Sequence, residues 1–591
     1  MTARPGINRA CADLIVEELV RCGVDLFCLS SGFRSAPLAM AVVAHPEARY
    51  VMHYDERGSA FFAVGYGRAT LRPAAWITTS GTAAANGLPA VVEAALDGVP
   101  MLLLTADRPP ELRETGANQT IDQVGLFARY PRWEFDMPPP GEDSRSETLL
   151  TTVDQAVYRA CSSPMGPVHL NCMFREPLAD EEAGTVRHTF VENLDSWKKN
   201  TTPWTTYVHS ERRLELRTAE TVWNTLRTTK RGLFVAGRLL SKADGEAALR
   251  LAHHLRWPLV ADVASQARLG AESDVLIHAA DQVLGNEGFR SAMVPDAVLH
   301  VGGPCVSKRL LHFLADARPS PYLLVRDCPD RLDPNHQVTH RIEMAAAGFC
   351  NALLEVAPPG VNSSWLETWR NASSAAERAI DDCLSATAEL SEPFVVRAVT
   401  RHIPDSHALV LGSSMPIRDG DMFAAIDGAL PLVATNRGAS GIDGTIATAA
   451  GVACGTGAPV TVILGDLALL HDLNSLSLVA SHAVVVVVLN NNGGGIFHFL
   501  SVAEPEIYFE KCFGTPHGMT FEAAAEQFSL TYSRPTSPEA FVEAYLQACL
   551  RGSATLIEVG TDRTQNREVH RHLLSLAAAS VDDQQQKESR Q

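Results

Sequence analysis

Long apolar runs are missing from this sequence. No stretch of the 591 residues approaches the ~20 consecutive apolar residues that a membrane-spanning helix requires, and the amino terminus lacks the apolar core of a signal peptide. We therefore expect a cytoplasmic protein that does not span a membrane.

Paired cysteines are missing as well. The 12 cysteines include no C-x-x-C pair and stand singly in apolar surroundings, as Cys11, Cys22, Cys28 and Cys454 do. In a long chain without a secretion signal, this usage favours reduced cysteines buried in the core over a disulfide framework.

Positive charge is scarce. Lysine and arginine number 50 against 68 aspartates and glutamates, which gives a net charge of -18. This excess of negative charge argues against nucleic acid or an anionic membrane as a partner. If the substrates are anionic, a local group of arginines must bind them against the field of the whole protein.

Short apolar runs alternate with helical patterns along most of the chain. The runs 24–29, 75–79 and 100–106 are typical of strands, and their alternation with helices indicates parallel sheets covered on both faces. The length is too great for one core. We predict an α/β protein with three doubly wound parallel-sheet domains, at 1–185, 211–358 and 380–575, followed by a disordered polar tail at 576–591.

The stretch 460–497 carries the clearest chemical signal. Residues 460–464 and 484–489 are β-branched runs typical of buried parallel strands, with leucines at helical spacing between them. Asp466 and the asparagines at 490–492 follow the two strands, so we expect them at one sheet edge, where open α/β sheets bind ligands. Carboxylate, amide and carbonyl oxygens suit Mg²⁺, which leaves positions open for phosphate oxygens. Spacing alone equally allows an ordinary βαβ unit with a helix-capping aspartate and an Asn-Gly turn.

The same stretch resembles the signature of thiamine diphosphate enzymes, in which Gly-Asp is followed by Asn-Asn. Here the signature reads Gly465-Asp466 and NNNGGGIF. The resemblance implies that Asp466, Asn491 and the carbonyl of Gly493 hold Mg²⁺ or Mn²⁺, and that Gly465 and Leu467 contact the cofactor. One departure is Leu467, where the family usually has glycine.

Three α/β domains in series also resemble the decarboxylase-like branch of that family. The likeness implies a thiamine diphosphate-binding fold in the first and third domains and an active site between the first domain of one subunit and the third of its partner, hence a homodimer or homotetramer. In YDERG, Glu56 matches the glutamate that activates the cofactor by binding its pyrimidine nitrogen. The alternative for Glu56 is an acidic residue that the helix dipole favours in a first turn.

Further segments give a closer resemblance. TADRPPEL, GANQ, DERG, NRGASGIDG, GDL and FEKCFGTPHG are together similar to the 2-succinyl-5-enolpyruvyl-6-hydroxy-3-cyclohexene-1-carboxylate synthase family of menaquinone and phylloquinone biosynthesis, over nearly the full length. That family also has Gly-Asp-Leu. The likeness implies that 2-oxoglutarate is decarboxylated on the cofactor and that the resulting succinyl carbanion adds to isochorismate.

The family pattern also implies roles for individual residues. Glu56, Gln119 and Arg437 would be catalytic. Ser414 and Ile442 would contact the cofactor, and Ser414 and Arg418, with Arg437, would face the part derived from 2-oxoglutarate. The substrate-binding residues for isochorismate would be Arg34, Arg108, Asn118 and Gln119, with Lys308 and Arg309 from the middle domain, and the pocket walls would be Ile496, Phe497 and Leu500.

Two departures and two rival functions accompany this resemblance. The family's P-G-S-R-S-T is here SGFRSA, which puts Phe33 and Ala36 beside the expected isochorismate site, and Gly-Asn-Ser becomes Gly412-Ser413-Ser414. Neither change removes a charge. The rivals are another 2-oxo acid decarboxylase or acetolactate-type synthase, which would need fewer arginines, and a non-catalytic cofactor-binding subunit.

Overall fold

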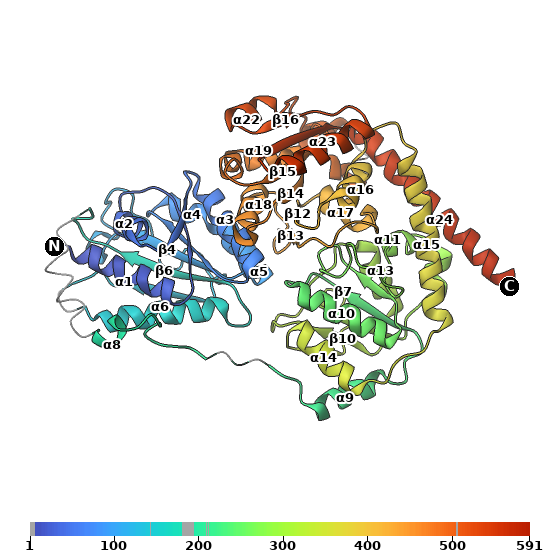
Figure 1. Cartoon of the computed structure of the whole chain (residues 1–591), viewed down its shortest axis with the longest axis horizontal. Helices are drawn as coiled ribbons and strands as arrows, with labels where there is room; N and C mark the ends of the chain where they lie inside the picture. The colour runs from blue at the N-terminus through green and yellow to red at the C-terminus, as the bar shows by residue number, and fades with distance from the viewer. Residues whose placement is uncertain are drawn as a thin grey trace. The chain divides into compact units, whose positions relative to one another are not determined.

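The computed structural model describes residues 6–141, 144–179, 194–208, 210, 212–503 and 506–590. It contains three parallel sheets flanked by helices, which confirms the predicted α/β class (Figure 1). Within those ranges, no helix combines the length and the apolar character needed to cross a bilayer.

The first sheet has six parallel strands in the order β2-β1-β3-β4-β6-β5. Its central strands are buried on both faces, as their uninterrupted apolar sequence predicts. The strands are β1 (Leu26–Leu29), β2 (Arg49–Met52), β3 (Ala74–Thr78), β4 (Met101–Asp107), β5 (Trp133–Met137) and β6 (Pro167–Met173).

Helices cover both faces of this sheet. On one face, α1 (Ile7–Arg21), α2 (Ala36–Ala44) and α6 (Ser146–Cys161) bury their apolar sides against the strands in one core. On the other face lie α3 (Glu56–Thr70) and α5 (Leu88–Asp97).

The third sheet repeats the strand order of the first. Its order is β13-β12-β14-β15-β17-β16, so each strand has the place of its counterpart in the first sheet. In both sheets the order reverses beside the first strand, and this switch point opens a crevice at the carboxyl ends of the strands. The strands are β12 (Ala408–Leu411), β13 (Val433–Thr435), β14 (Val460–Gly465), β15 (Val484–Asn490), β16 (Thr531–Ser533) and β17 (Thr555–Gly560).

The middle sheet has five parallel strands in the order β11-β10-β9-β7-β8. They are β7 (Gly232–Ala236), β8 (Leu259–Ala261), β9 (Ala297–Val301), β10 (Tyr322–Val325) and β11 (His340–Ile342). The main helices in and after this part of the chain are α9 (Leu216–Leu226), α10 (Lys242–Leu255), α13 (Lys308–Ala317), α14 (Ala346–Val356), α15 (Ser364–Ser385), α16 (Glu392–His402), α17 (Met415–Phe423), α18 (Thr445–Thr456) and α23 (Pro538–Arg551).

The chain divides into two compact units. The first contains Met1–Ser210, Asn436–Ala458 and His471–His482, and the second contains Glu211–Thr435, Pro459–Leu470 and Ala483–Gln591. Two segments from the third predicted domain thus belong with the first sheet. This division into two units does not test the predicted boundaries at 1–185, 211–358 and 380–575, which stay a prediction.

The crossover between β14 and β15 is not one helix. It consists of α19 (Asp466–His471), a 3₁₀ turn (Leu473–Ser475) and α20 (Leu476–Val479). The break follows Asp472, whose buried carboxylate accepts hydrogen bonds from the backbone of Ile446 and Ala447 at 2.8 and 3.1 Å. These bonds cap the start of α18, and Asp472 Oδ1 also accepts from Ser475 Oγ at 2.7 Å, a local bond of the kind that competes with continued helix.

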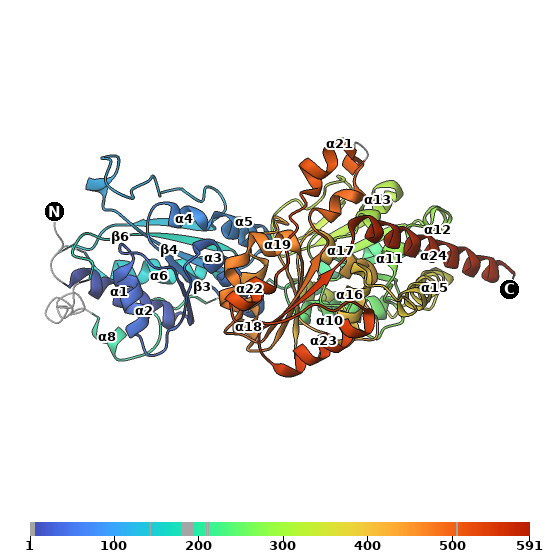
Figure 2. The ribbon, with the colours of Figure 1, turned by 90° about the horizontal axis from the view of Figure 1, so that it is seen from above.

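The carboxyl terminus differs from the sequence-based expectation. Instead of a disordered tail at 576–591, helix α24 (Arg563–Arg590) continues along α15, as Figures 1 and 2 show. The physical reason is that Leu573, Ala577 and Val581 recur every four residues and are fully buried in the core of the second unit. Asp582, Asp583, Gln586 and Lys587 of this segment are exposed.

Candidate active site

The ends of β14 and β15 bring the predicted metal ligands together. The two strands pair in parallel, with Gly465 opposite Leu489, so Asp466 and Asn491 follow at the same edge. Asp466 is buried and accepts hydrogen bonds from its own helix at Leu467 N (2.7 Å) and from Gly493 N (2.8 Å). His517 Nε2 lies 3.1 Å from the same carboxylate.

Asn491 has one satisfied and one unsatisfied side-chain group. Its Nδ2 donates to Glu392 Oε1 at 2.8 Å, whereas its Oδ1 is buried and meets no partner within the described residues. A buried amide oxygen without a partner is costly, and a divalent cation would provide the interaction that this oxygen lacks.

The glycines beside these residues have two different environments. Gly493 adopts φ +130°, and a Cβ there would lie 1.9 Å from the carbonyl oxygen of Gly514, so only glycine fits. Gly465 faces open space instead, with no atom within 4 Å of an added Cβ. The edge thus combines oxygen ligands with room beside them, which fits Mg²⁺ and a diphosphate.

A loop at the switch point of the third sheet supplies Ser414. This residue has φ 74° and ψ -127°, a conformation that non-glycine residues rarely adopt, and it directly precedes α17. Strained backbone of this kind is common at ligand sites. Because β12 neighbours β14 in the sheet, Ser414 and Asp466 flank the crevice that the switch point opens.

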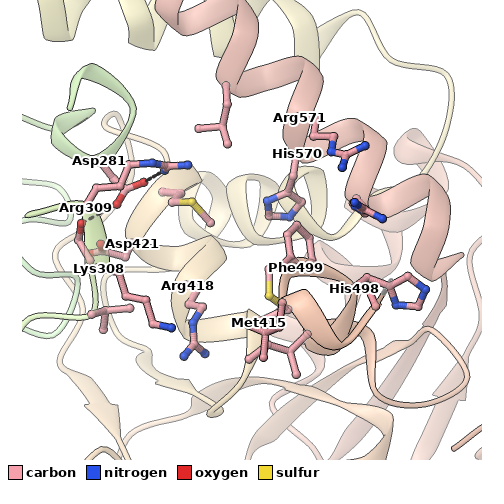
Figure 3. A pocket seen from close by; sticks show the side chains of 18 of the residues that line it. Asp281, Lys308, Arg309, Met415, Arg418, Asp421, His498, Phe499, His570 and Arg571 are labelled. Carbon is pink, nitrogen blue, oxygen red and sulfur yellow. Dashed lines mark hydrogen bonds and ion pairs between the residues drawn. The ribbon is translucent and has the colours of Figure 1, made fainter. Parts of the chain in front are cut away.

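A cavity of about 640 Å³ lies in the second unit (Figure 3). Segments from five parts of the chain line it, namely Asp281, residues 306–312 at the start of α13, helix α17, the 3₁₀ turn Gly495–Phe499 with the residues after it, and helix α24. Among the residues predicted for substrate binding, it contains Lys308, Arg309, Arg418, Ile496 and Leu500. Phe497 is not part of the lining, and its ring packs against Phe513 at 5.4 Å.

The positively charged side chains that line this cavity have different surroundings. Arg309 forms an ion pair with Asp281, drawn as a dashed line in Figure 3. Arg418 donates to the carbonyl oxygen of Ser414, one turn earlier on its own helix. Lys308 and Arg418 extend toward the same side of the cavity in the figure, which gives that side a positive character.

Helix α24 forms a wall of the cavity that the sequence did not predict. His570 is buried between Phe423 and Phe499, with ring centroids 5.1 and 4.9 Å away, and its Nε2 lies 3.2 Å from Asp419 Oδ1. Arg567 and Arg571 also line the cavity. Burial raises the pKa of the Asp419 carboxyl. These residues lie in no recognised motif, and helical periodicity through 573–581 was the one available signal.

The predicted isochorismate residues of the first unit gather around Ser80. Arg108 and Gln119 both bond Ser80, Arg108 to its hydroxyl and Gln119 Nε2 to its carbonyl oxygen at 3.0 Å. Arg34 is buried and donates to the carbonyl of Phe174 at 2.9 Å. Burial first, and then the charge of Arg108, lowers the pKa of Arg34. Asn118 precedes Gln119 on the same exposed loop.

Two buried arginines close together favour an anion. Burial also lowers the pKa of Arg108, although Asp107 and Glu176 partly offset this effect. A ligand carboxylate between Arg34 and Arg108 would relieve both the desolvation and the repulsion. The departures at Phe33 and Ala36 flank this group, and Phe33 is exposed.

Glu56 begins helix α3, as the motif predicts. Asp55 caps this helix by accepting from Arg57 N and Gly58 N, and Glu56 Oε2 lies 3.5 Å from Asn86 Nδ2. Since Glu56 belongs to the first unit and Asp466 to the second, the structure describes the two halves of the predicted cofactor site separately.

Arg437 and Ile442 belong to the first unit with Glu56. Their loop is held by Glu93, which accepts from Gly438 N at 2.8 Å and Ala439 N at 2.7 Å. The loop leads into α18, which packs closely on α3 because small residues meet there. Gly65 approaches the carbonyl oxygen of Thr448 so closely that a Cβ would lie 2.1 Å from it.

Comparison with known proteins agrees with this arrangement. Three family models match the chain: "Thiamine pyrophosphate enzyme, N-terminal TPP binding domain" at residues 9–126, "Middle domain of thiamine pyrophosphate" at 188–411 and "Thiamine pyrophosphate enzyme, C-terminal TPP binding domain" at 431–559. Thiamine pyrophosphate is another name for thiamine diphosphate. The N-terminal model includes β1 to β4 of the first sheet, and the C-terminal model includes β13 to β17 of the third, through residue 559.

Curated relatives extend the match over nearly the whole chain. A protein of Rubrobacter xylanophilus is 53% identical over 97% of this chain and 99% of its own length. A protein of Salinibacter ruber is 49% identical over 96% of each chain, and one of Chlorobaculum tepidum is 42% identical over 95% of each chain. All three are named 2-succinyl-5-enolpyruvyl-6-hydroxy-3-cyclohexene-1-carboxylate synthase. The chain is therefore a thiamine diphosphate enzyme and belongs to the 2-succinyl-5-enolpyruvyl-6-hydroxy-3-cyclohexene-1-carboxylate synthase family.

Proposed function

We propose that this enzyme decarboxylates 2-oxoglutarate and adds the remaining succinyl unit to isochorismate, as a step of menaquinone biosynthesis. Its relatives carry the name of the product of this reaction. Both substrates carry more than one carboxylate, which accounts for clustered arginines in a protein of net charge -18.

The observation that carries the proposal is the second unit's combination of oxygen ligands and a cation-lined cavity. Asp466 and the unpaired Oδ1 of Asn491 suit a divalent metal, Mg²⁺ or Mn²⁺. The cavity presents Lys308 and Arg418 beside the apolar side chains of Ile496 and Leu500. This mixture of positive charge and apolar surface suits substrates that carry more than one carboxylate.

Thiamine diphosphate, when bound, supplies the carbon nucleophile and the electron sink for decarboxylation. The protein contributes placement and charge. Glu56 would hold a proton at the pyrimidine nitrogen, and Ile442 would support the cofactor from the first unit. Arg418 and Arg437 would bind the carboxylates derived from 2-oxoglutarate, with Ser414 between them and the cofactor.

The group around Ser80 would bind the second substrate. Arg34 and Arg108 would pair with carboxylates of isochorismate, and Gln119, fixed through Ser80, would orient its hydroxyl or ring. Asn118 would add a neutral hydrogen bond. Lys308 and Arg309 would reach the same substrate from the middle domain.

We further propose that the working enzyme is a homodimer or homotetramer, in which the first domain of one subunit and the third of another complete each site. The proposal follows from the resemblance to decarboxylase-like thiamine diphosphate enzymes; Glu56 lies in one unit of the chain, and Asp466 and Asn491 lie in the other. Neither unit alone contains all the predicted cofactor residues.

One assay tests the proposed function. Purified protein, Mg²⁺, thiamine diphosphate and 2-oxoglutarate are incubated with and without isochorismate, and CO₂ and the coupled product are measured. We expect product only when isochorismate is present. CO₂ release with no coupled product would support the decarboxylase alternative, and no CO₂ release at all would support a non-catalytic binding subunit.

A further inference from the structure

Glu392 is a buried carboxylate in an unusual place. It is the first residue of α16, a position where glutamate normally points into water and benefits from the helix dipole, yet it is only 1% exposed. A buried carboxylate requires hydrogen bonds. Glu392 Oε1 receives them from Asn491 Nδ2 at 2.8 Å and from Thr561 Oγ1 at 3.3 Å, so it connects the ends of β15 and β17.

The bond to Asn491 determines which way that amide faces. Glu392 Oε1 accepts this hydrogen bond, so the NH₂ group of Asn491 points toward Glu392. Its Oδ1 then points away, into the site where it is buried without a partner in the described structure. The opposite orientation would direct N–H groups at a cation and place two oxygens against each other.

We infer that Glu392 is a positioning residue, which fixes the Asn491 amide so that Oδ1 is presented to the divalent metal. The inference deepens the proposed function and rests on it for the identity of the metal-diphosphate site. Replacing a residue that hydrogen-bonds a metal-ligating side chain typically weakens metal affinity by about 10- to 100-fold.

The neighbouring residue provides a matched comparison. Asn490 also donates through Nδ2 to a buried glutamate, Glu558, at 2.8 Å. The Oδ1 of Asn490, however, accepts from Asn492 N at 3.2 Å, so it is already occupied. The same kind of pair thus occurs twice on one strand end, and only the Asn491 pair leaves an oxygen for a ligand.

The test measures metal affinity rather than turnover. Mn²⁺ is titrated into protein saturated with thiamine diphosphate, and bound Mn²⁺ is followed by electron paramagnetic resonance. We expect Glu392→Ala to weaken Mn²⁺ binding by about 10- to 100-fold. We expect Glu392→Gln, which keeps an oxygen acceptor for Asn491 Nδ2, to recover most of the affinity. Turnover of Glu392→Ala should return toward the wild-type value at saturating metal.

The control is Glu558→Ala, which removes the acceptor of the matched pair and should leave the Mn²⁺ affinity unchanged. Circular dichroism and thermal unfolding of every variant check that the fold is retained. If folded Glu392→Ala binds Mn²⁺ as tightly as the wild type, or if folded Glu558→Ala weakens binding equally, the inference is wrong. A wild-type protein that binds neither Mn²⁺ nor thiamine diphosphate would instead contradict the proposed function itself.

Discussion

Glu18 is a fully buried carboxyl group whose partners hold the segment after the first sheet. Its oxygens accept hydrogen bonds from Trp197 Nε1 and Trp204 N. Asp154 lies beside it and accepts from Cys22 Sγ and Thr205 N. Glu18, Cys22 and Asp154 lie within 4.8 Å of one another. Since each carboxylate oxygen already has a donor, the pair fits a shared proton better than a metal.

The shared proton makes stability depend on pH. Burial, followed by the hydrogen bond with Asp154, raises the pKa of Glu18 to about 8 from its ordinary 4.5. Between these values the folded protein retains a proton that the unfolded chain has lost, so stability decreases as pH rises. We predict that the unfolding free energy of Glu18→Gln, relative to wild type, increases by about 2 kcal/mol from pH ~5 to pH ~8. Denaturant unfolding at both pH values measures this, and parallel pH profiles would contradict it.

Glu56 is the residue that we propose activates the cofactor. Its replacement by glutamine keeps the size of the side chain and the cap at Asp55 but removes the acid. We predict that turnover falls by at least about 100-fold, while thiamine diphosphate still binds. Steady-state kinetics and a cofactor titration by tryptophan fluorescence separate the two effects. Turnover near the wild-type value would remove Glu56 from its proposed role.

Gly465 and Gly493, at the carboxyl ends of β14 and β15, differ in the space around them, so we expect different effects when each is replaced by alanine. Gly493→Ala would place its Cβ 1.9 Å from Gly514 O, so we expect a lower melting temperature and weaker cofactor binding. Gly465→Ala meets open space in the protein, so we expect an unchanged melting temperature without cofactor. Its Cβ would nevertheless occupy room beside Asp466 and weaken thiamine diphosphate binding about tenfold, or ~1.4 kcal/mol. Unchanged cofactor affinity in a stable Gly465→Ala would exclude Gly465 from the cofactor site.

Helix α24 is the element for which the sequence was most misleading. Its polar composition predicts a disordered tail, but Ala577 and Val581 are fully buried and Asn286 Nδ2 donates to Ala578 O and Asp582 Oδ1. Amino-acid composition does not reveal this packing, because two apolar residues one helical turn apart are enough to hold a largely polar helix against its neighbours.

A truncation tests this correction. A chain that ends at Leu574 loses the buried Val581 and leaves Asn286 Nδ2 without partners, so we predict a loss of about 3 kcal/mol in unfolding free energy. A chain that ends at Lys587 is the matched control and should have wild-type stability. Equal stability of the two truncated proteins would show that the terminal turns contribute nothing to the core.

Across the whole molecule, features that follow from local sequence patterns could be predicted, whereas contacts between residues far apart in the sequence could not. Buried parallel strands produce apolar runs that the sequence displays, so the three sheets could be predicted, and with them the approach of Asp466 to Asn491 at one edge. Glu392 could not be predicted, because its bond to Asn491 joins residues 99 positions apart and nothing about an N-terminal helix glutamate indicates burial. His517 and His570 escaped prediction for the same reason.

The resemblance to a known family identified substrate-binding arginines that composition and periodicity could not. The arginines near Ser80 and those beside the cavity are unremarkable singly, since most strand-end arginines form surface ion pairs. Family motifs grouped Arg34 with Arg108; in the structure the charge of Arg108 acts on Arg34, and Ser80 links Arg108 to Gln119. The identity of the substrates rests on this grouping together with the relatives.

We propose that this one enzyme removes the 2-oxo carboxylate of 2-oxoglutarate and transfers the remaining carbons to isochorismate. Mass spectrometry of the product made from uniformly ¹³C-labelled 2-oxoglutarate and unlabelled isochorismate tests it directly. We predict a product that keeps every labelled carbon except that of the lost carboxyl group, formed only when Mg²⁺ and thiamine diphosphate are both present. Labelled succinic semialdehyde, with no label joined to isochorismate, would contradict the account.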